Sequence, residues 1–254
     1  MGSIKILYKP VSLTPLQAIE KFKEQNPEYK SAKISYPGRL DPMAEGLLIL
    51  LVENENKKMI QYMKLNKEYQ AQIIFGFGTD SYDILGIAQP DKNIKLEPQV
   101  IKKKIKELKG SYNQTLPAYS SYKIKGKALF HYARTNQLDK IKLPKKTIQI
   151  KDLKINSIHT ITGNKLLKQI TTKINNLKGD FRQEEILKKW NSLLKTNLEE
   201  KYTVADITLS CSTGTYIRSI ADDLGKRLNT SAILINLKRT KIGNYNLKNS
   251  VKIN

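Results

Sequence analysis

The sequence contains few of the residues from which disulfides and metal centres are built. It has one cysteine, Cys211, and two histidines among 254 residues. A single cysteine excludes an intramolecular disulfide, and three Cys and His side chains in total are too few for the four ligands of a structural zinc site. We therefore predict no bound metal, and the low cysteine count is typical of a cytoplasmic protein.

Long hydrophobic runs are also missing. The longest runs from Leu47 to Val52, whereas a membrane-spanning helix needs about 20 apolar residues. The first ten residues, MGSIKILYKP, do not resemble a signal peptide, so we predict no membrane association. The chain is long enough to bury a sizeable core, and no Pro/Gly/Ser-rich linker divides it. We predict one domain over residues 1–254, monomeric and cytoplasmic.

Arginine is scarce in a chain that is otherwise strongly basic. Lys and Arg together number 45 against 23 acidic residues, which gives a net charge of +22 and indicates a polyanionic partner such as a nucleic acid. Lys, Ile and Asn are abundant together, as in proteins from AT-rich genomes, and this accounts for part of the lysine excess. It does not account for the six arginines, which we expect where a planar, permanently charged group is needed.

The apolar pattern predicts an α/β (α+β) fold. Thr14 and Gln17 form a capping box before a helix that should bury Leu16, Ile19 and Phe22. Residues 98–108 should form a second helix with Gly110 as its cap, and residues 213–228 a third. Strands are predicted before residue 10 and over residues 47–52, 69–77 and 204–212.

Two of these predictions specify which side chains share a face. In the strand over residues 69–77, the apolar face should hold Tyr69, Ala71, Ile73, Phe75 and Phe77. In the last helix, the inward positions should be Ile217, Ile220, Leu224 and Leu228.

The segment from about residue 160 to 201 is more polar and rich in Lys and Asn. It should contain one helix, whose apolar face carries Ile186, Leu187, Trp190, Leu193 and Leu194. We interpret this segment as an insertion in the domain.

Asp41 stands in a Gly/Pro-framed turn, directly before the buried strand. Asp-Pro is common in turns, so a structural role is one interpretation. The alternative is a nucleophile, which would have to stay ionised in a pocket where burial raises the pKa of a carboxyl. A guanidinium would favour the ionised form, and Arg39 and Arg218 are the candidates.

Arg218 and Tyr69 each allow two interpretations as well. Arg218 falls in the first turn of its predicted helix, where the helix dipole disfavours a cation, so a carboxylate elsewhere would explain it; otherwise it is an exposed surface residue. Tyr69 is either a core aromatic or a ring that stacks on a base.

Several stretches together resemble the TruB-type tRNA pseudouridine synthases. GRLDPMAEG resembles the family's catalytic pattern G-x-L-D-P-x-A-x-G, and NKEY, which ends at Tyr69, resembles its K-x-Y motif. The stretches GTDSYDILG, QTLPAYSSYKIKGKALFHYAR, CSTGTYIRSIADDLG and LKRTKIGNY resemble later family motifs in the same order. The resemblance extends from about residue 9 to residue 253, except for the segment 160–201.

The resemblance implies a pseudouridine-synthase fold, with a central, mostly antiparallel mixed sheet flanked by helices. It implies isomerisation of a uridine in the T loop of tRNA, flipped from its stack, with Asp41 as nucleophile, Tyr69 stacking on the base and Arg218 pairing with Asp41. No cofactor is implied. The other implied substrate-binding positions are Lys9, Pro10, Tyr36, Arg39, Thr79, Asp80, Tyr119, Lys123, Tyr216 and Leu237.

The sequence departs from the family pattern at several points. Tyr36 stands where the family has a histidine, and Ser12 and Leu116 replace a glycine and a proline. Arg39 gives a GRLD stretch that is similar to relatives acting on ribosomal RNA. We therefore keep two alternatives, a ribosomal RNA substrate and a non-catalytic RNA-binding or RNA-folding module. We also expect no C-terminal PUA-type domain.

Overall fold

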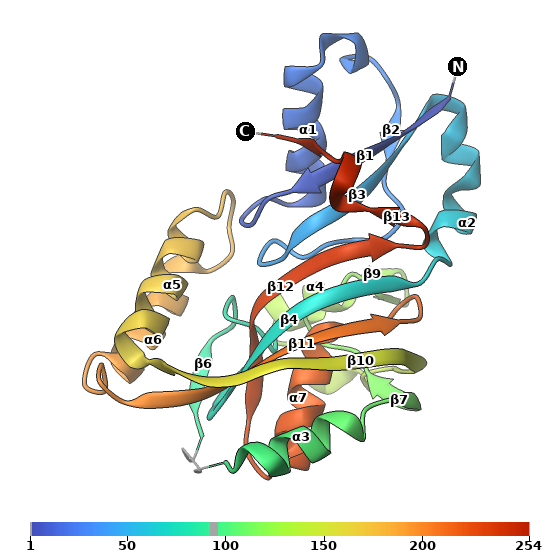
Figure 1. Cartoon of the computed structure of the whole chain (residues 1–254). Helices are drawn as coiled ribbons and strands as arrows, with labels where there is room; N and C mark the ends of the chain where they lie inside the picture. Colours follow the sequence, from blue (N-terminus) through green and yellow to red (C-terminus); the bar gives the residue numbers. More distant parts are fainter. Residues whose placement is uncertain (1, 92–95, 254) are drawn as a thin grey trace.

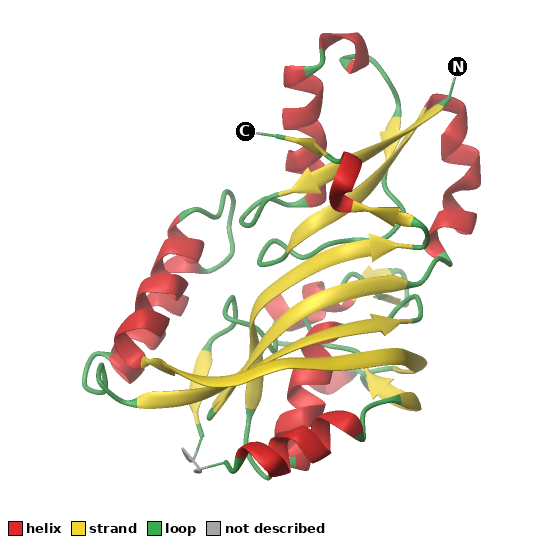
Figure 2. Cartoon of the chain, in the orientation of Figure 1, coloured by secondary structure: helices red, strands yellow, loops and turns green. Residues whose placement is uncertain are grey.

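One mixed sheet runs through the whole molecule (Figures 1 and 2). The computed structural model describes residues 2–91 and 96–253. Within these ranges the sheet has ten strands, and its pairs are antiparallel except β1 with β14 and β3 with β12. The predicted mostly antiparallel mixed sheet is confirmed.

The order of the strands places distant parts of the sequence side by side. The main path is β14 (Val251–Lys252), β1 (Ser3–Lys9), β3 (Glu45–Val52), β12 (Ala232–Ile242), β4 (Lys67–Phe75), β11 (Lys201–Cys211), β10 (Lys145–Thr162) and β7 (Gly110–Thr115). The short strands β2 (Ile34–Ser35) and β13 (Tyr245–Asn246) pair with β3 and β12. Two separate ribbons pair β5 (Phe77–Thr79) with β6 (Ala88–Pro90), and β8 (Lys123–Ile124) with β9 (Lys127–Ala128).

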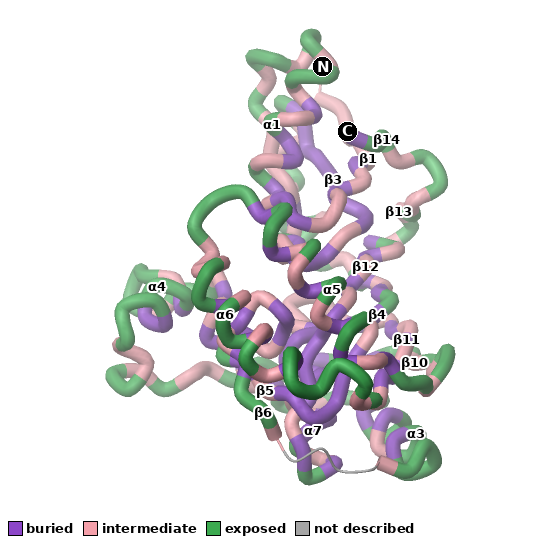
Figure 3. The backbone as a smooth tube through the Cα atoms, turned by 90° about the vertical axis from the view of Figure 1, so that its left-hand side faces the viewer, coloured by how far each residue is buried: buried purple, intermediate pink, exposed green. Residues whose placement is uncertain are grey.

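Helices pack on both faces of the sheet. They are α1 (Pro15–Gln25), α2 (Met59–Met63), α3 (Pro98–Lys106), α4 (Leu129–Arg134), α5 (Gly163–Asn175), α6 (Gln183–Leu194) and α7 (Ile217–Arg227). Successive strand residues point to opposite faces, so Ile73 packs into the core with α3 and α7, whereas Ile74 packs with α5 and α6. The central strands β3, β4, β11 and β12 are largely buried between these layers, whereas most residues of β10 and the outer side of α4 are exposed (Figure 3).

The first part of the chain forms an N-terminal module made of β1, α1, β2, β3 and α2. Phe22 of α1 packs on one face of the β1–β3 pair, and Tyr62 of α2 packs on the other. The predicted capping box is confirmed, because Thr14 and Gln17 exchange hydrogen bonds between side chain and backbone. Both chain ends lie near this module (Figure 1).

Two predicted core positions were wrong. Leu16 is 61% exposed, because the buried stripe of α1 runs through Pro15, Ala18, Ile19 and Phe22, and Leu16 lies about 100° around the helix from Pro15. Phe77 does not share the face of Tyr69. The strand is interrupted at Gly76, which has φ +90°, and Phe77 packs against Trp190 and Tyr202 in the other core cluster.

Two helix predictions also need correction. Gly110 does not cap the helix over residues 98–108, because α3 ends at Lys106 and Gly110 is the first residue of β7. The segment 160–201 holds two helices rather than one. The expected face of α6 is confirmed, with Trp190 fully buried, but the buried face of α5 was missed because its leucine and isoleucines stand four residues apart among Lys, Thr and Asn.

The predicted face of α7 is confirmed, since its inward residues from Ile217 to Leu228 are buried. None of the described helices is long and apolar enough to cross a bilayer.

Candidate active site

The loop between β2 and β3 carries Asp41. Its ends are glycines with positive φ, +97° at Gly38 and +110° at Gly46, a conformation that strongly favours glycine. Gly46 also lies against the next strand, where an added Cβ would stand 2.3 Å from the Arg239 carbonyl oxygen. The loop therefore turns tightly and passes close to β12, which leaves the Asp41 side chain about one-third exposed.

The carboxylate of Asp41 forms an ion pair with Arg218. Arg218 Nε donates to Asp41 Oδ2 at 2.8 Å, and the other guanidinium nitrogens donate to the carbonyls of Ser81 and Tyr119 at 2.8 and 3.1 Å. The Arg218 side chain is only 4% exposed. Burial lowers the pKa of this guanidinium, but Asp41 and Asp83 outweigh burial and raise it. The ion pair expected from the sequence is present.

A second carboxylate, Asp83, is paired with the same guanidinium nitrogen, and our sequence analysis missed it. Its Oδ2 is 3.6 Å from Arg218 Nε, and its Oδ1 accepts from Ser81 Oγ and the Leu85 amide. Burial raises the pKa of Asp83 to about 6, although Arg218 opposes this rise. The signal that could have found it is the stretch GTDSYDILG, in which Asp83 is the second aspartate and lies three residues before the final glycine.

Tyr69 lies in a row of residues that crosses the sheet. Arg239 pairs with Tyr69 on one side and Leu209 pairs with it on the other, so the three share the face covered by α7. Tyr69 is 8% exposed, and burial raises the pKa of its hydroxyl, with Asp41 adding to the rise. The hydroxyl is therefore protonated at neutral pH.

Two buried cations hold the backbone of the loop between β2 and β3, which carries Asp41 and is called the catalytic loop below. Arg239 donates to the carbonyls of Leu47, Arg39 and Gly38 at 2.8, 2.9 and 3.4 Å. Lys9 Nζ reaches the other side and donates to the Ala44 carbonyl at 2.6 Å.

The same lysine is also bonded within its own loop, since Lys9 Nζ donates to the carbonyls of Pro10 and Leu13. Burial lowers the pKa of Lys9 to about 7, while Asp41 opposes the change. Lys9 therefore supports the loop from behind and is closed to solvent, whereas Pro10 is partly exposed; substrate binding by these two residues stays a prediction.

Other predicted residues surround the ion pair. Tyr119 accepts from Arg218 through its carbonyl, and Thr79 Oγ1 donates to the Asp83 carbonyl at 2.8 Å. Asp80 is paired with Arg182 at 2.8 Å. Tyr216 precedes α7, and its backbone exchanges two hydrogen bonds with the Gln114 side chain.

The remaining predicted residues lie farther out. Arg39 is exposed beside the loop, and Tyr36 is partly buried against the core of the N-terminal module. Lys123 is exposed on β8 and makes no hydrogen bond to the other candidate residues in the described part of the chain. Leu237 is buried in the core cluster that contains Tyr69.

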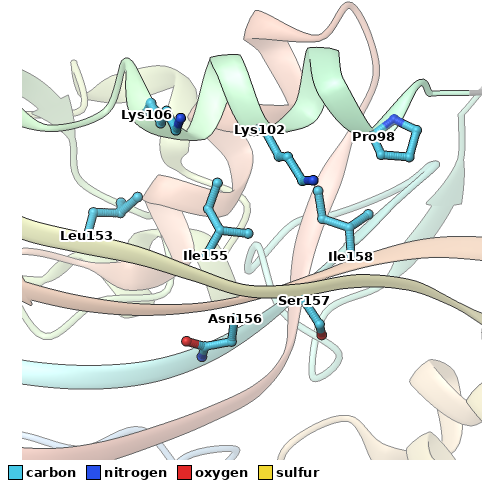
Figure 4. Close-up of a pocket in the computed structure, with 8 residues that line it drawn as sticks. All are labelled: Pro98, Lys102, Lys106, Leu153, Ile155, Asn156, Ser157 and Ile158. Carbon is cyan, nitrogen blue, oxygen red and sulfur yellow. The ribbon is translucent and has the colours of Figure 1, made fainter.

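Two pockets lie in the described part of the structure, and neither is lined by Asp41 or Arg218. One, of about 560 Å³, lies behind the catalytic loop and is lined by Met43, Glu45, Gln72, Leu237 and Lys238, among others. The other, of about 450 Å³, lies between α3 and β10. Figure 4 shows Lys102 of α3 extending toward Ile158, while Asn156 and Ser157 point away on the other side of the strand.

The residues described contain no cluster of three or more His, Cys, Asp or Glu side chains that could hold a metal. The charged centre therefore consists of two carboxylates around one buried guanidinium, with an aromatic ring from β4 on the same side of the sheet. Such a centre can hold one ionised carboxylate at a partly open position, as nucleophilic catalysis by an aspartate needs.

The fold is that of pseudouridine synthases of the Cbf5 type. A solved Cbf5–Nop10–Gar1 complex aligns with a TM-score of 0.60 over 98% of this chain and 51% of that chain, at 16% identity. A solved structure of an H/ACA RNP bound to a substrate RNA aligns with a TM-score of 0.57. The chain spans about half the length of these solved chains, and at this identity the likeness shows the fold alone.

The sequence comparisons then define the family. The model of the TruB family pseudouridylate synthase N-terminal domain matches residues 26–182. The tRNA pseudouridine synthase B of Mesoplasma florum is 32% identical over 99% of this chain and 72% of that protein. The one of Malacoplasma penetrans is 31% identical over 94% of this chain and 84% of that protein. The chain belongs to the TruB family of pseudouridine synthases, which are isomerases.

Proposed function

We propose that this enzyme converts one uridine in the T loop of tRNA into pseudouridine, with Asp41 as the nucleophile. The observation that carries the proposal is the ion pair of Asp41 with the buried Arg218. The names of the relatives, which act on tRNA, support the RNA class. The net charge of +22 supports a polyanionic substrate.

The first step is binding of the RNA with the target uridine flipped out of its stack, which costs a few kcal/mol. Tyr69 then stacks on the base, and base–aromatic stacking contributes about 1–3 kcal/mol toward that cost. Because burial keeps the Tyr69 hydroxyl protonated, it is a hydrogen-bond donor in the resting enzyme.

In the second step Asp41 attacks the nucleoside, at C6 of uracil or at C1′ of the sugar. The glycosidic C1′–N1 bond breaks, the uracil rotates, and C5 bonds to C1′. The proton on C5 leaves, N1 gains a proton, and Asp41 is released, so the reaction is an isomerisation that needs no cofactor. We expect Tyr69 to take part in the removal of the C5 proton.

Arg218 has two roles in this mechanism. Its charge favours the ionised Asp41 that a nucleophile requires. Its two bonds to the Ser81 and Tyr119 carbonyls fix the guanidinium plane, so Nε points the carboxylate in one direction. Asp83 is a second anionic partner of the same Nε, and Lys9 and Arg239 hold the loop backbone.

The test is to map pseudouridine in a T-arm stem-loop and in a ribosomal RNA hairpin after treatment with purified protein. We expect product in the T loop with the wild type and none above trace with Asp41→Asn, because a neutral amide is a far poorer nucleophile. Asp41→Asn should still bind the RNA, since phosphate contacts supply most of the affinity. Product from Asp41→Asn would contradict the nucleophile, and preference for the ribosomal hairpin would contradict the substrate.

A cytoplasmic, monomeric enzyme remains our prediction, as does the single domain over residues 1–254.

A further inference from the structure

The helical hairpin α5–α6 reaches the rim of the active site. Figure 1 shows the two helices beside the sheet, with their connecting turn on the side of the N-terminal module. The turn, residues 176–182, is the part of the hairpin farthest along the chain from β10 and β11. The apolar face of the hairpin packs on the sheet, so the turn is held in place by a rigid support.

The hairpin is hydrogen-bonded to the N-terminal module. Gln17 of α1 donates to the carbonyl of Lys178 at 3.1 Å, and Ser12 donates to the carbonyl of Lys173 at 3.2 Å. These contacts join residues about 160 positions apart in the sequence, and they place the turn next to the module that carries the catalytic loop.

The other side of the turn is bonded to the elements around Arg218. Arg182 is paired with Asp80 at 2.8 Å, and its guanidinium carbon lies 4.6 Å from the centre of the Tyr119 ring. Arg134 of α4 donates to the Asp180 carbonyl at 3.0 Å. The Tyr119 carbonyl accepts from Arg218, which in turn donates to Asp41. Only two residues, Tyr119 and Arg218, therefore separate Arg182 from Asp41 along this path.

Arg182 has a strained backbone conformation at this rim. Its φ of +61° is left-handed, which is unfavourable for a non-glycine residue and persists where surrounding contacts impose it. The contacts to Asp80 and Tyr119 are of this kind. The side chain is nevertheless 26% exposed, and that of Asp80 is 35% exposed, so the pair remains open to solvent and to a competing anion.

The charge of the hairpin suits a polyanion. Residues 163–195 contain eight Lys and Arg against three Asp and Glu, a net charge of +5. Two of the acids, Glu184 and Glu185, stand in the first turn of α6, where the helix dipole stabilises them. Lys178 and Arg182 are the basic residues at the end that meets the active site, and Lys178 is exposed.

We propose that this turn is an RNA-binding wall of the active site, where Lys178 and Arg182 contact phosphates of the strand that carries the target uridine. The proposal rests on the RNA-modifying function above, and it assigns a substrate contact to a segment outside the family motifs. The guanidinium of Arg182, stacked on Tyr119, exchanges part of its contact with Asp80 for a phosphate oxygen when RNA binds.

A tethered cleavage probe tests the position of the RNA. The chain has one cysteine, Cys211, which is buried and whose pKa burial raises to about 11, so an introduced surface cysteine can be labelled selectively. Lys178→Cys carrying an iron chelate should cleave the bound RNA next to the target uridine. Lys195→Cys, exposed at the opposite end of the hairpin, should not cleave there.

The salt dependence of binding provides an independent measurement. Lys178→Ala with Arg182→Gln should lower the slope of log affinity against log salt by about 0.7 for each lost phosphate contact, or about 1.4 in total. The matched control, Lys165→Ala with Lys195→Ala, also removes two exposed charges of the hairpin and should keep the wild-type slope. Urea unfolding of each variant verifies the fold.

The outcomes separate this inference from the proposed function. If the wild type forms no pseudouridine in any RNA tested, the proposed function fails. If it forms pseudouridine but position 178 gives no cleavage near the target and the two double variants share one slope, the RNA-binding wall is wrong and Arg182 serves only to hold Asp80.

Discussion

Two buried arginines contact the loop that carries Asp41, and they differ in what they bind. Arg218 donates to two carbonyls and is paired through Nε with the carboxylates of Asp41 and Asp83. Arg239, 1% exposed, donates to three carbonyls, and no ion pair links it to an acid among the residues described. The first can therefore fix the direction of the Asp41 carboxylate, and the second can fix the path of the backbone that carries Asp41.

The two arginines therefore have separate tasks: Arg218 is paired with acids, and Arg239 holds the backbone of the loop. A guanidinium beside a carboxylate favours its ionised form, whereas carbonyl partners do not titrate. Removal of each arginine should accordingly affect different measurements.

The largest effect should come from Arg218→Met. Arg218 fixes the direction of the Asp41 carboxylate, so activity should fall by orders of magnitude when this group is removed. The loss should appear in kcat, because the RNA is held mainly by phosphate contacts. Steady-state kinetics over a range of pH would show this.

Arg218→Lys is the matched variant that keeps the charge but loses the planar group. It should recover part of the rate while leaving the direction of Asp41 less fixed. Equal kcat for Arg218→Met and the wild type would show that the ion pair is not part of catalysis.

Arg239→Met should act next, and mainly on stability. It leaves the carbonyls of Leu47, Arg39 and Gly38 without this donor, and an unsatisfied buried polar group costs about 1–3 kcal/mol. We expect the free energy of unfolding, measured in urea, to fall by about 3 kcal/mol. Activity should fall at all pH values, without a shift of the acidic limb of the rate–pH profile. A shifted limb would mean that Arg239 also tunes a titrating group.

Asp83→Asn should have a smaller effect that depends on pH. The folded pKa of Asp83 is about 6, above its unfolded value of 3.8, so the folded state holds a proton that the unfolded state has lost between these values. The wild type therefore loses stability as pH rises from about 4 to 6. Relative to wild type, Asp83→Asn should become more stable by about 2–3 kcal/mol over this window.

Urea unfolding between pH 4 and 7.5 measures that difference. A difference between the two proteins that does not change with pH would show that Asp83 is ionised in the folded state throughout, held so by Arg218.

The smallest effect should come from Arg39→Met. Its side chain is exposed next to the loop, and only its carbonyl is bonded to Arg239. We expect an unchanged kcat and a severalfold higher RNA concentration at half-maximal rate, with the salt slope lower by about 0.7–0.9. A large fall in kcat with Arg39→Met would reverse the assignment of the two arginines near Asp41.

Local patterns in the sequence predicted much of the fold. Alternation and helical spacing identified β3, β4, β11, α1 and α7, because each depends on residues close in sequence. Some errors were local, as at Leu16 and α5, and one fell where a distant contact decided the outcome. Phe77 changes faces because Gly76 breaks the strand and α6 covers the other side, which the alternation could not indicate.

The sequence by itself determined the family, the loop that carries Asp41, and Arg218 as its partner, because these follow from motifs and from a cation placed against a helix dipole. Only the tertiary structure decided that Asp83 shares that guanidinium, that Arg239 bonds to three backbone carbonyls, and that Arg182 reaches Asp80. The physical reason is distance along the chain. Arg182 and Asp80 are 102 residues apart, and Arg239 and Arg39 are 200 apart, so no local preference encodes these contacts. They form only when the packed sheet and its helices bring the segments together.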